Sequence, residues 1–157
     1  MFLLRVRGLF ANVSQPGAYG AHVWLQPTSP SARIANAGDM TVTPGIWTAA
    51  ILAQPAKSQG KYACVSPETL SYAECLDIWA EVTGKRAVFV KCTVEEFTKV
   101  WGPPGEEFAA QLAWGEVVED WTSGLPGGFV GMEELGIRGE GIGHRAALER
   151  IKGMGLL

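Results

Sequence analysis

The sequence lacks a strong excess of charge of either sign. Charged residues make up 18% of the 157 residues, and the formal net charge is -3. Proteins that bind nucleic acids neutralise phosphates with clustered lysine and arginine side chains, and no such cluster is present here. We therefore expect no nucleic-acid partner.

Long apolar runs are also missing. A helix that crosses a membrane needs about 20 consecutive apolar residues. The apolar stretch at the N-terminus is interrupted by Arg5 and Arg7, so it forms neither a membrane span nor a regular signal sequence. We expect a cytoplasmic protein with no membrane partner.

Motifs that bind metals or activate nucleophiles are absent as well. The three cysteines, Cys64, Cys75 and Cys92, have neither the CxxC spacing of a zinc site nor the even number of a disulfide framework. The sequence contains no HExxH motif, no nucleophile elbow and no Ser-His-Asp order. We expect neither a metal ion nor a cofactor, and we interpret the cysteines as small buried side chains.

Apolar residues, in contrast, are plentiful at 47%, as in an ordinary globular protein. The length fits one domain spanning residues 1–157. Residues 1–20 give no clear structural signal, and the glycine-rich residues 123–143 are expected to form a surface loop.

Strand and helix patterns alternate along the chain. Capping boxes at Ser71 and Thr93, each followed three residues later by glutamate, mark two helix starts. Helices are expected at 44–54, 72–83, 94–101, 106–121 and 144–152, and strands at 19–26, 38–43, 61–66 and 87–91. This pattern indicates an α+β fold in which a small sheet packs against amphipathic helices.

An ordered series of segments resembles one protein family. The segments are Asn36–Val42, Gly60–Tyr62, Thr69–Val90, Glu95–Gly102, Gln111–Glu116 and Glu133–Ile137. Together they resemble the C-terminal half of NmrA-like and isoflavone-reductase-like proteins, over roughly residues 20–140. Members of this family are similar to atypical short-chain reductases, whose N-terminal half is a Rossmann domain that binds NAD(P)H.

The resemblance does not extend to that N-terminal half. Residues 10–17 follow no strand-helix unit, and Gly139–Gly143 is a poor match to a dinucleotide loop, so we interpret it as a turn. We therefore expect the Rossmann half to be absent and NAD(P)H chemistry by this chain alone to be excluded. A region that normally packs on a Rossmann sheet would expose apolar surface, which predicts a homodimer.

Three residues are candidates for acid-base chemistry. His22 lies in an expected strand and can act as a general acid or base, or serve as a hydrogen-bonded structural histidine. Asp39 can contact substrate or cap a turn. Glu116 follows Trp114-Gly115 on an expected helix, where it can also be part of a solvated face.

Aromatic residues are the candidates for ligand binding. The chain has six tryptophans, and Trp79 and Trp121 fit core positions of their expected helices. The remaining tryptophans and two tyrosines can line an aromatic pocket or belong to the core; these are Tyr19, Trp24, Trp47, Tyr62, Trp101 and Trp114.

Three functions are compatible with this sequence. The first is a non-redox isomerase, dehydratase or cyclase of fungal secondary metabolism that acts on a hydrophobic intermediate. As an alternative, the resemblance permits a regulatory module that contacts another protein, as NmrA-like regulators do. It also permits a half-subunit of an NAD(P)H reductase whose Rossmann domain resides on another chain.

Overall fold

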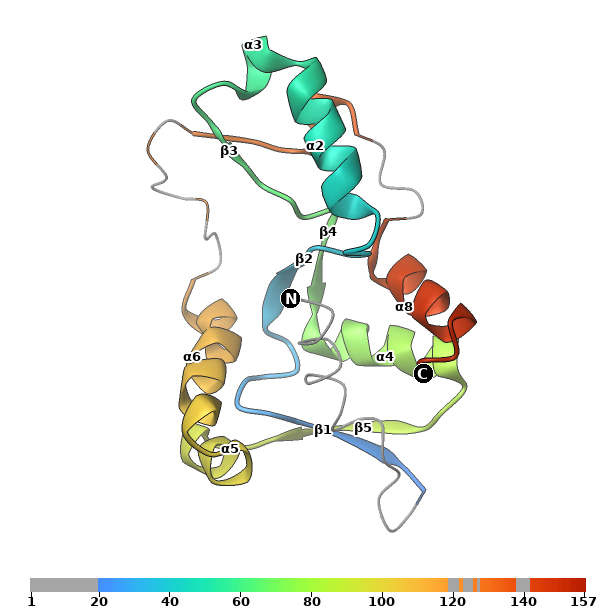
Figure 1. Ribbon diagram of the computed structural model, residues 1–157. Helices are drawn as coiled ribbons and strands as arrows, with labels where there is room; N and C mark the ends of the chain where they lie inside the picture. The colour runs from blue at the N-terminus through green and yellow to red at the C-terminus, as the bar shows by residue number, and fades with distance from the viewer. Residues whose placement is uncertain (1–19, 119–121, 123–125, 127, 138–141) are drawn as a thin grey trace. The chain divides into compact units, whose positions relative to one another are not determined.

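The computed structural model describes residues 20–118, 122, 126, 128–137 and 142–157 (Figure 1). Helices and short strands alternate along the chain, which confirms the expected α+β class. The strands are β1 (His22–Gln26), β2 (Arg33–Asn36), β3 (Tyr62–Ala63), β4 (Glu68–Ser71), β5 (Ala87–Lys91) and β6 (Phe129–Val130). The helices are α2 (Thr43–Ala53), α3 (Pro55–Ser58), α4 (Tyr72–Thr83), α5 (Val94–Trp101), α6 (Pro103–Val117), α7 (Met132–Leu135) and α8 (His144–Gly153).

The chain divides into two compact units, and each is built from separated stretches of sequence. Unit 1 comprises Met1–Ile34, Leu70–Glu119 and Leu157, and unit 2 comprises Ala35–Thr69 and Asp120–Leu156. Two of the boundaries fall inside β2 and β4, which pair with each other. The chain therefore passes from one unit to the other within these two strands.

Unit 1 is organised around a parallel pair of strands, β1 and β5. His22 pairs with Ala87 and Gln26 with Lys91, so the two strands are in register over their full length. Alternate residues of β1 are buried on the face toward α4. Trp24 contacts Tyr72 of α4 and Phe89 of β5, with ring centroids 5.6 and 5.9 Å apart.

Helix α4 supplies the other side of this core. Its N-terminus is fixed by the predicted capping box, in which the Ser71 hydroxyl accepts from the Glu74 N–H and the Glu74 carboxylate accepts from the Ser71 N–H. Its buried residues follow the predicted helical spacing: Tyr72, Cys75, Leu76, Trp79 and Val82. Gly84 ends the helix in the left-handed conformation, as expected at this position.

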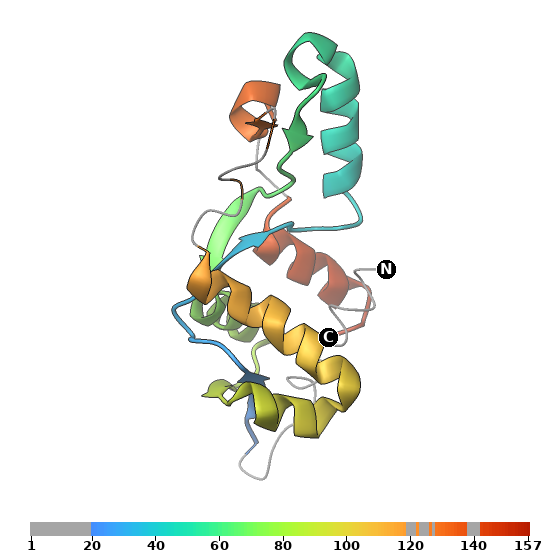
Figure 2. The ribbon, with the colours of Figure 1, turned by 90° about the vertical axis from the view of Figure 1, so that its left-hand side faces the viewer.

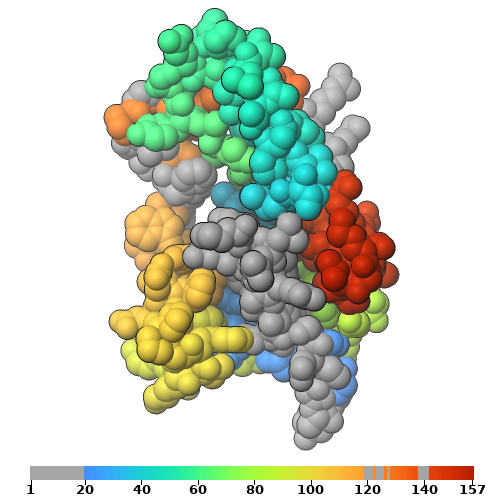
Figure 3. Space-filling model, in the orientation of Figure 1, coloured from blue at the N-terminus to red at the C-terminus, as the bar shows by residue number. Residues whose placement is uncertain are grey.

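Helices α5 and α6 form a hairpin in the same unit. Figures 1 and 2 show them side by side, and in Figure 3 their yellow atoms form a continuous surface on the face shown. Helix α6 begins at Pro103, earlier than the predicted start at 106, because proline at the first helical positions is compatible with a helix. Gly115 allows close packing: a Cβ there would lie 2.6 Å from the Arg33 carbonyl oxygen.

Unit 2 has its own apolar core around α2. Trp47 is 1% exposed and packs with Val130 and Leu135. Around them lie Ala50, Ile51, Val65, Met132 and Ile137. Strands β3 and β6 pair in parallel, with Tyr62 opposite Phe129.

Two predictions about this unit differ from the structure. The strand predicted at 38–43 is wrong, because these residues form a turn that leads into α2. Within 123–143, expected to be a loop, the described residues include β6 and α7. Parts of that segment, and nearly all of the uncertain N-terminal residues 1–20, lie outside the described residues.

Candidate functional site

His22 lies on the inner face of β1 and is 6% exposed. Its backbone N–H donates to the Arg86 carbonyl oxygen at 2.8 Å, and its ring lies 5.2 Å from the ring of Trp79. Its Nδ1 atom is buried and has no hydrogen-bond partner among the residues that the structure describes. Burial, together with the positive charge of Lys85, holds the pKa of His22 below its ordinary value. The imidazole is therefore neutral at pH 7 and has an unused nitrogen.

Asp39 lies in unit 2 and is bound by several donors. Its carboxylate accepts from the Thr41 N–H at 2.9 Å and the Thr41 hydroxyl at 2.6 Å, and it forms an ion pair with Arg150. Burial raises the pKa of Asp39, but the hydrogen bonds from Thr41 and Arg150 outweigh this effect and lower it overall. These contacts favour a structural role, in which Asp39 ties the turn before α2 to α8.

Glu116 lies at the C-terminal end of α6, in unit 1. Its carboxylate accepts from the Thr28 hydroxyl at 2.9 Å and from the Ser29 N–H, and it pairs with Lys91 at 3.4 Å. The pKa of Glu116 is lowered because the Ser29 and Thr28 donors stabilise the charged form. The alternative of a purely solvated position is therefore wrong for Glu116: its contacts link α6 to the segment after β1 and to the end of β5.

The three acid-base candidates do not belong to one unit. His22 and Glu116 are in unit 1, and Asp39 is in unit 2. Their partners Arg150, Thr28 and Lys91 were not predicted, because each lies far along the chain from the acid that it contacts. The roles of all three in catalysis stay predictions, and of the three only His22 has a buried polar atom without a hydrogen-bond partner among the described residues.

The aromatic candidates occupy different environments. Trp24 and Trp47 are buried in the cores of unit 1 and unit 2. Tyr62 is 52% exposed on β3. Trp101 packs against Phe97, with the two ring centroids 6.1 Å apart.

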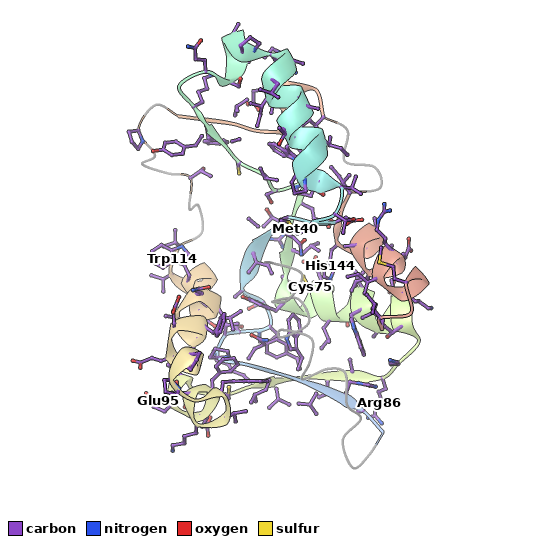
Figure 4. The ribbon with its side chains drawn as sticks, in the orientation of Figure 1. Met40, Cys75, Arg86, Glu95, Trp114 and His144 are labelled. Carbon is purple, nitrogen blue, oxygen red and sulfur yellow. The ribbon has the colours of Figure 1, made fainter. Side chains whose placement is uncertain are left out.

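Trp114 lies on α6 and is 57% exposed (Figure 4). Tyr19 lies outside the described residues. These placements favour core roles for the buried tryptophans and leave the ligand-binding assignments as predictions.

The glycine-rich start of α8 is the place where the pyrophosphate of a dinucleotide would have to fit. At the start of α8, the backbone N–H of His144 donates to the Glu68 carboxylate (Figure 4 labels His144). A Cβ atom on Gly143 would lie 2.8 Å from the same carboxylate. An anionic phosphate would therefore meet a carboxylate instead of free N–H groups, so the described residues at this helix start do not fit a dinucleotide.

The described part of the chain has neither a metal-binding cluster nor a membrane-spanning helix. No group of three or more His, Cys, Asp or Glu side chains is placed to hold a metal ion there. None of the helices there combines the length and the apolar character that crossing a bilayer requires.

The comparison with known proteins gives one match. No curated protein and no solved structure matches the chain. The model of the NmrA-like family matches residues 2–121, which is most of the sequence. The chain therefore belongs to the NmrA-like family.

Proposed function

We propose that this NmrA-like chain is a cytoplasmic, non-redox enzyme that transfers a proton within a hydrophobic intermediate of fungal secondary metabolism. The reaction would be an isomerisation, a dehydration or a cyclisation. One observation carries the proposal: the imidazole of His22 is buried, and its Nδ1 atom has no partner. Buried polar atoms are normally hydrogen-bonded, and exceptions often have a functional reason.

The chemistry follows from the state of the imidazole. Because the pKa of His22 is lowered, the ring is neutral at pH 7 and can accept a proton. The ring of Trp79 packs against it in the core of unit 1, with the ring centroids 5.2 Å apart. Such a group can remove a proton from one carbon of a bound molecule and return it to another, which requires no nicotinamide.

The acids would have secondary roles in this proposal. Glu116 and Asp39 are both held by donors that keep them ionised, and an ionised carboxylate is a poor general acid. Their contacts favour positioning α6 and α8. We therefore assign the proton transfer to His22.

The test is a gene deletion followed by mass spectrometry of the metabolites. The deleted strain is complemented with the wild-type gene, with His22→Gln or with His144→Gln. The His144 substitution is the matched control, because that histidine is also buried but its Nδ1 lies 3.3 Å from the Asn36 amide nitrogen. Circular dichroism of each purified variant verifies that the fold is intact.

The mass difference between the accumulated compound and the missing product identifies the reaction. Equal masses indicate isomerisation or cyclisation, and loss of one water indicates dehydration. The proposal requires that His22→Gln fails to restore the product while His144→Gln restores it. A difference of two hydrogens would indicate redox chemistry and would overturn the proposal.

A second candidate function is a binding module, and exposed apolar side chains favour it. Val23 on β1 and Val88 and Val90 on β5 are 36%, 39% and 37% exposed. Val23 and Val88 are register partners, so these side chains share the outer face of a parallel pair. Parallel sheets are usually covered on both faces, which supports a partner subunit at this face.

Native mass spectrometry with and without NADPH separates the possible partners. We expect a homodimer that does not bind NADPH. Copurification of a different protein, without turnover of small molecules, would support the regulatory module. Stoichiometric NADPH binding, alone or with a Rossmann-bearing chain, would support the half-subunit of a reductase.

A further inference from the structure

Trp79 has a buried hydrogen-bond donor without an acceptor. The residue lies on α4 and is 2% exposed, and its Nε1 atom has no hydrogen-bond partner within the described part of the chain. The indole N–H can only donate, so any group that binds it must be an acceptor. The helical pattern of the sequence correctly places Trp79 in the core, but it does not reveal this unpaired donor.

A second unpaired nitrogen lies on the neighbouring ring. The ring of His22 is 5.2 Å from that of Trp79, and its Nδ1 atom is also buried and unpartnered. Two contacting rings from β1 and α4 therefore each have a nitrogen without a partner. A third group that bonds to both nitrogens would complete this pair.

Trp47 provides a comparison in unit 2. It is 1% exposed, and its Nε1 atom is likewise unpartnered. It packs among apolar side chains, including Val130 and Leu135. Trp47 is therefore a matched control for the removal of a buried indole.

We infer that Trp79 is a substrate-binding residue whose indole N–H donates to the carbonyl oxygen of a hydrophobic ketone, beside His22. This inference rests on the proposed function and specifies its substrate class. A carbonyl makes the neighbouring C–H bond acidic enough for a neutral imidazole to remove the proton. It also places the developing negative charge on an oxygen, where an N–H donor stabilises it.

The step is balanced without a further reactant. The Nδ1 atom of His22 takes a proton from the carbon next to the carbonyl, and the electron pair of that C–H bond forms a carbon–carbon double bond. The carbonyl π electrons move to the oxygen, giving an enolate that accepts the Trp79 N–H. If the imidazolium returns this proton to another carbon, the product is an isomer of the substrate. If the imidazolium first exchanges its proton with solvent and then protonates the original carbon, the product is the same ketone with an exchanged hydrogen.

The experiment uses α-tetralone as the ketone probe and tetralin as its hydrocarbon counterpart. Proton–nitrogen NMR of the full chain follows the indole N–H signals, with Trp79→Phe and Trp47→Phe used for assignment. In deuterated water, loss of the α-proton signal of tetralone measures the rate of enolisation. Near-ultraviolet circular dichroism verifies that each variant is folded.

We expect tetralone, but not tetralin, to shift the Trp79 indole signal, and we expect the Trp47 signal to stay in place. Trp79→Phe should slow the exchange about tenfold or more, as removal of one donor to an oxyanion does, whereas Trp47→Phe should retain the wild-type rate. An equal response of Trp79 to both probes, or wild-type exchange in Trp79→Phe, would overturn the inference. The first of these results would mean that an ordered water satisfies the indole.

The two proposals can fail separately. If His22→Gln abolishes exchange and Trp79→Phe does not, the proposed proton transfer stands and the role of Trp79 is refuted. If tetralone shifts the Trp79 signal but the wild-type chain catalyses no exchange, the ketone site stands and proton transfer by His22 is refuted.

Discussion

Replacing Gly38 with alanine should destabilise unit 2 through two separate effects. Gly38 has a φ of +64°, where a residue with a side chain is strained by about 1–2 kcal/mol. An added Cβ would also lie only 1.8 Å from the Ile142 carbonyl oxygen. Rotation of a side chain cannot relieve this contact, because the obstructing oxygen belongs to the backbone of Ile142.

The backbone must therefore move, and a hydrogen bond would be lost. The Asp39 N–H donates to the same Ile142 oxygen at 2.9 Å, and a typical bond of this kind contributes about 1 kcal/mol. Adding this loss to the strain gives a destabilisation of about 2–3 kcal/mol. For a chain of this size, each kcal/mol lowers the melting temperature by about 2–4 °C.

Gly60→Ala is the matched control. Gly60 also lies in unit 2 and has a φ of +74°, but a Cβ there would have no atom within 4 Å. It should therefore cost only the conformational strain. Urea unfolding followed by circular dichroism gives the two free energies, and hydrogen exchange of α8 locates the loss. Equal unfolding midpoints for the two variants would refute the close docking of Gly38 on Ile142.

Three further outcomes are expected. Gly115→Ala should lower the melting temperature, because its Cβ would lie 2.6 Å from the Arg33 carbonyl oxygen. Gly45→Ala in α2 should raise the melting temperature or leave it unchanged, because its Cβ would have no atom within 4 Å. Calorimetry of both variants measures the two melting temperatures. Because the pKa of Glu116 is lowered by folding, its contribution to stability is present above the unfolded pKa of about 4.3 and is lost as pH falls through the folded value. Glu116→Gln should therefore reduce the loss of unfolding free energy at acid pH, as measured by urea unfolding. An unchanged loss would contradict the contacts of Glu116 with Thr28, Ser29 and Lys91. Ser71→Ala removes the cap of α4 and should cost about 1 kcal/mol in the same unfolding assay, with no loss expected if the capping box is absent in solution.

Local signals in the sequence predicted part of the fold well. The boxes at Ser71 and Thr93 define α4 and α5 because the bonds that cap a helix join residues only three apart. The strand at 87–91 was also predicted correctly. The strand predicted at 38–43 failed because the Asp39 side chain binds Thr41 two residues later, which stabilises a turn.

The environments of the candidate site residues could not be predicted in the same way. Asp39 pairs with Arg150, and Glu116 accepts from Thr28, across most of the chain. No periodicity or motif encodes such partners, so two carboxylates predicted as catalytic candidates have structural contacts instead. The sequence selected His22 by its residue type and its place in an expected strand, but its burial and its unpartnered nitrogen required the structure.

The interleaving of the two units has a consequence for how the protein is made. Because unit 2 draws on two separated stretches, it cannot be complete while the ribosome is still adding α8, and unit 1 needs the later stretch that contains β5 and α6. Strands such as β1 and β3 must wait for partners synthesised much later, so nascent chains expose unpaired edges that favour aggregation. Expressing either half of the gene alone would give a polypeptide with no finished core, and slower synthesis or lower temperature should improve the yield of the intact protein.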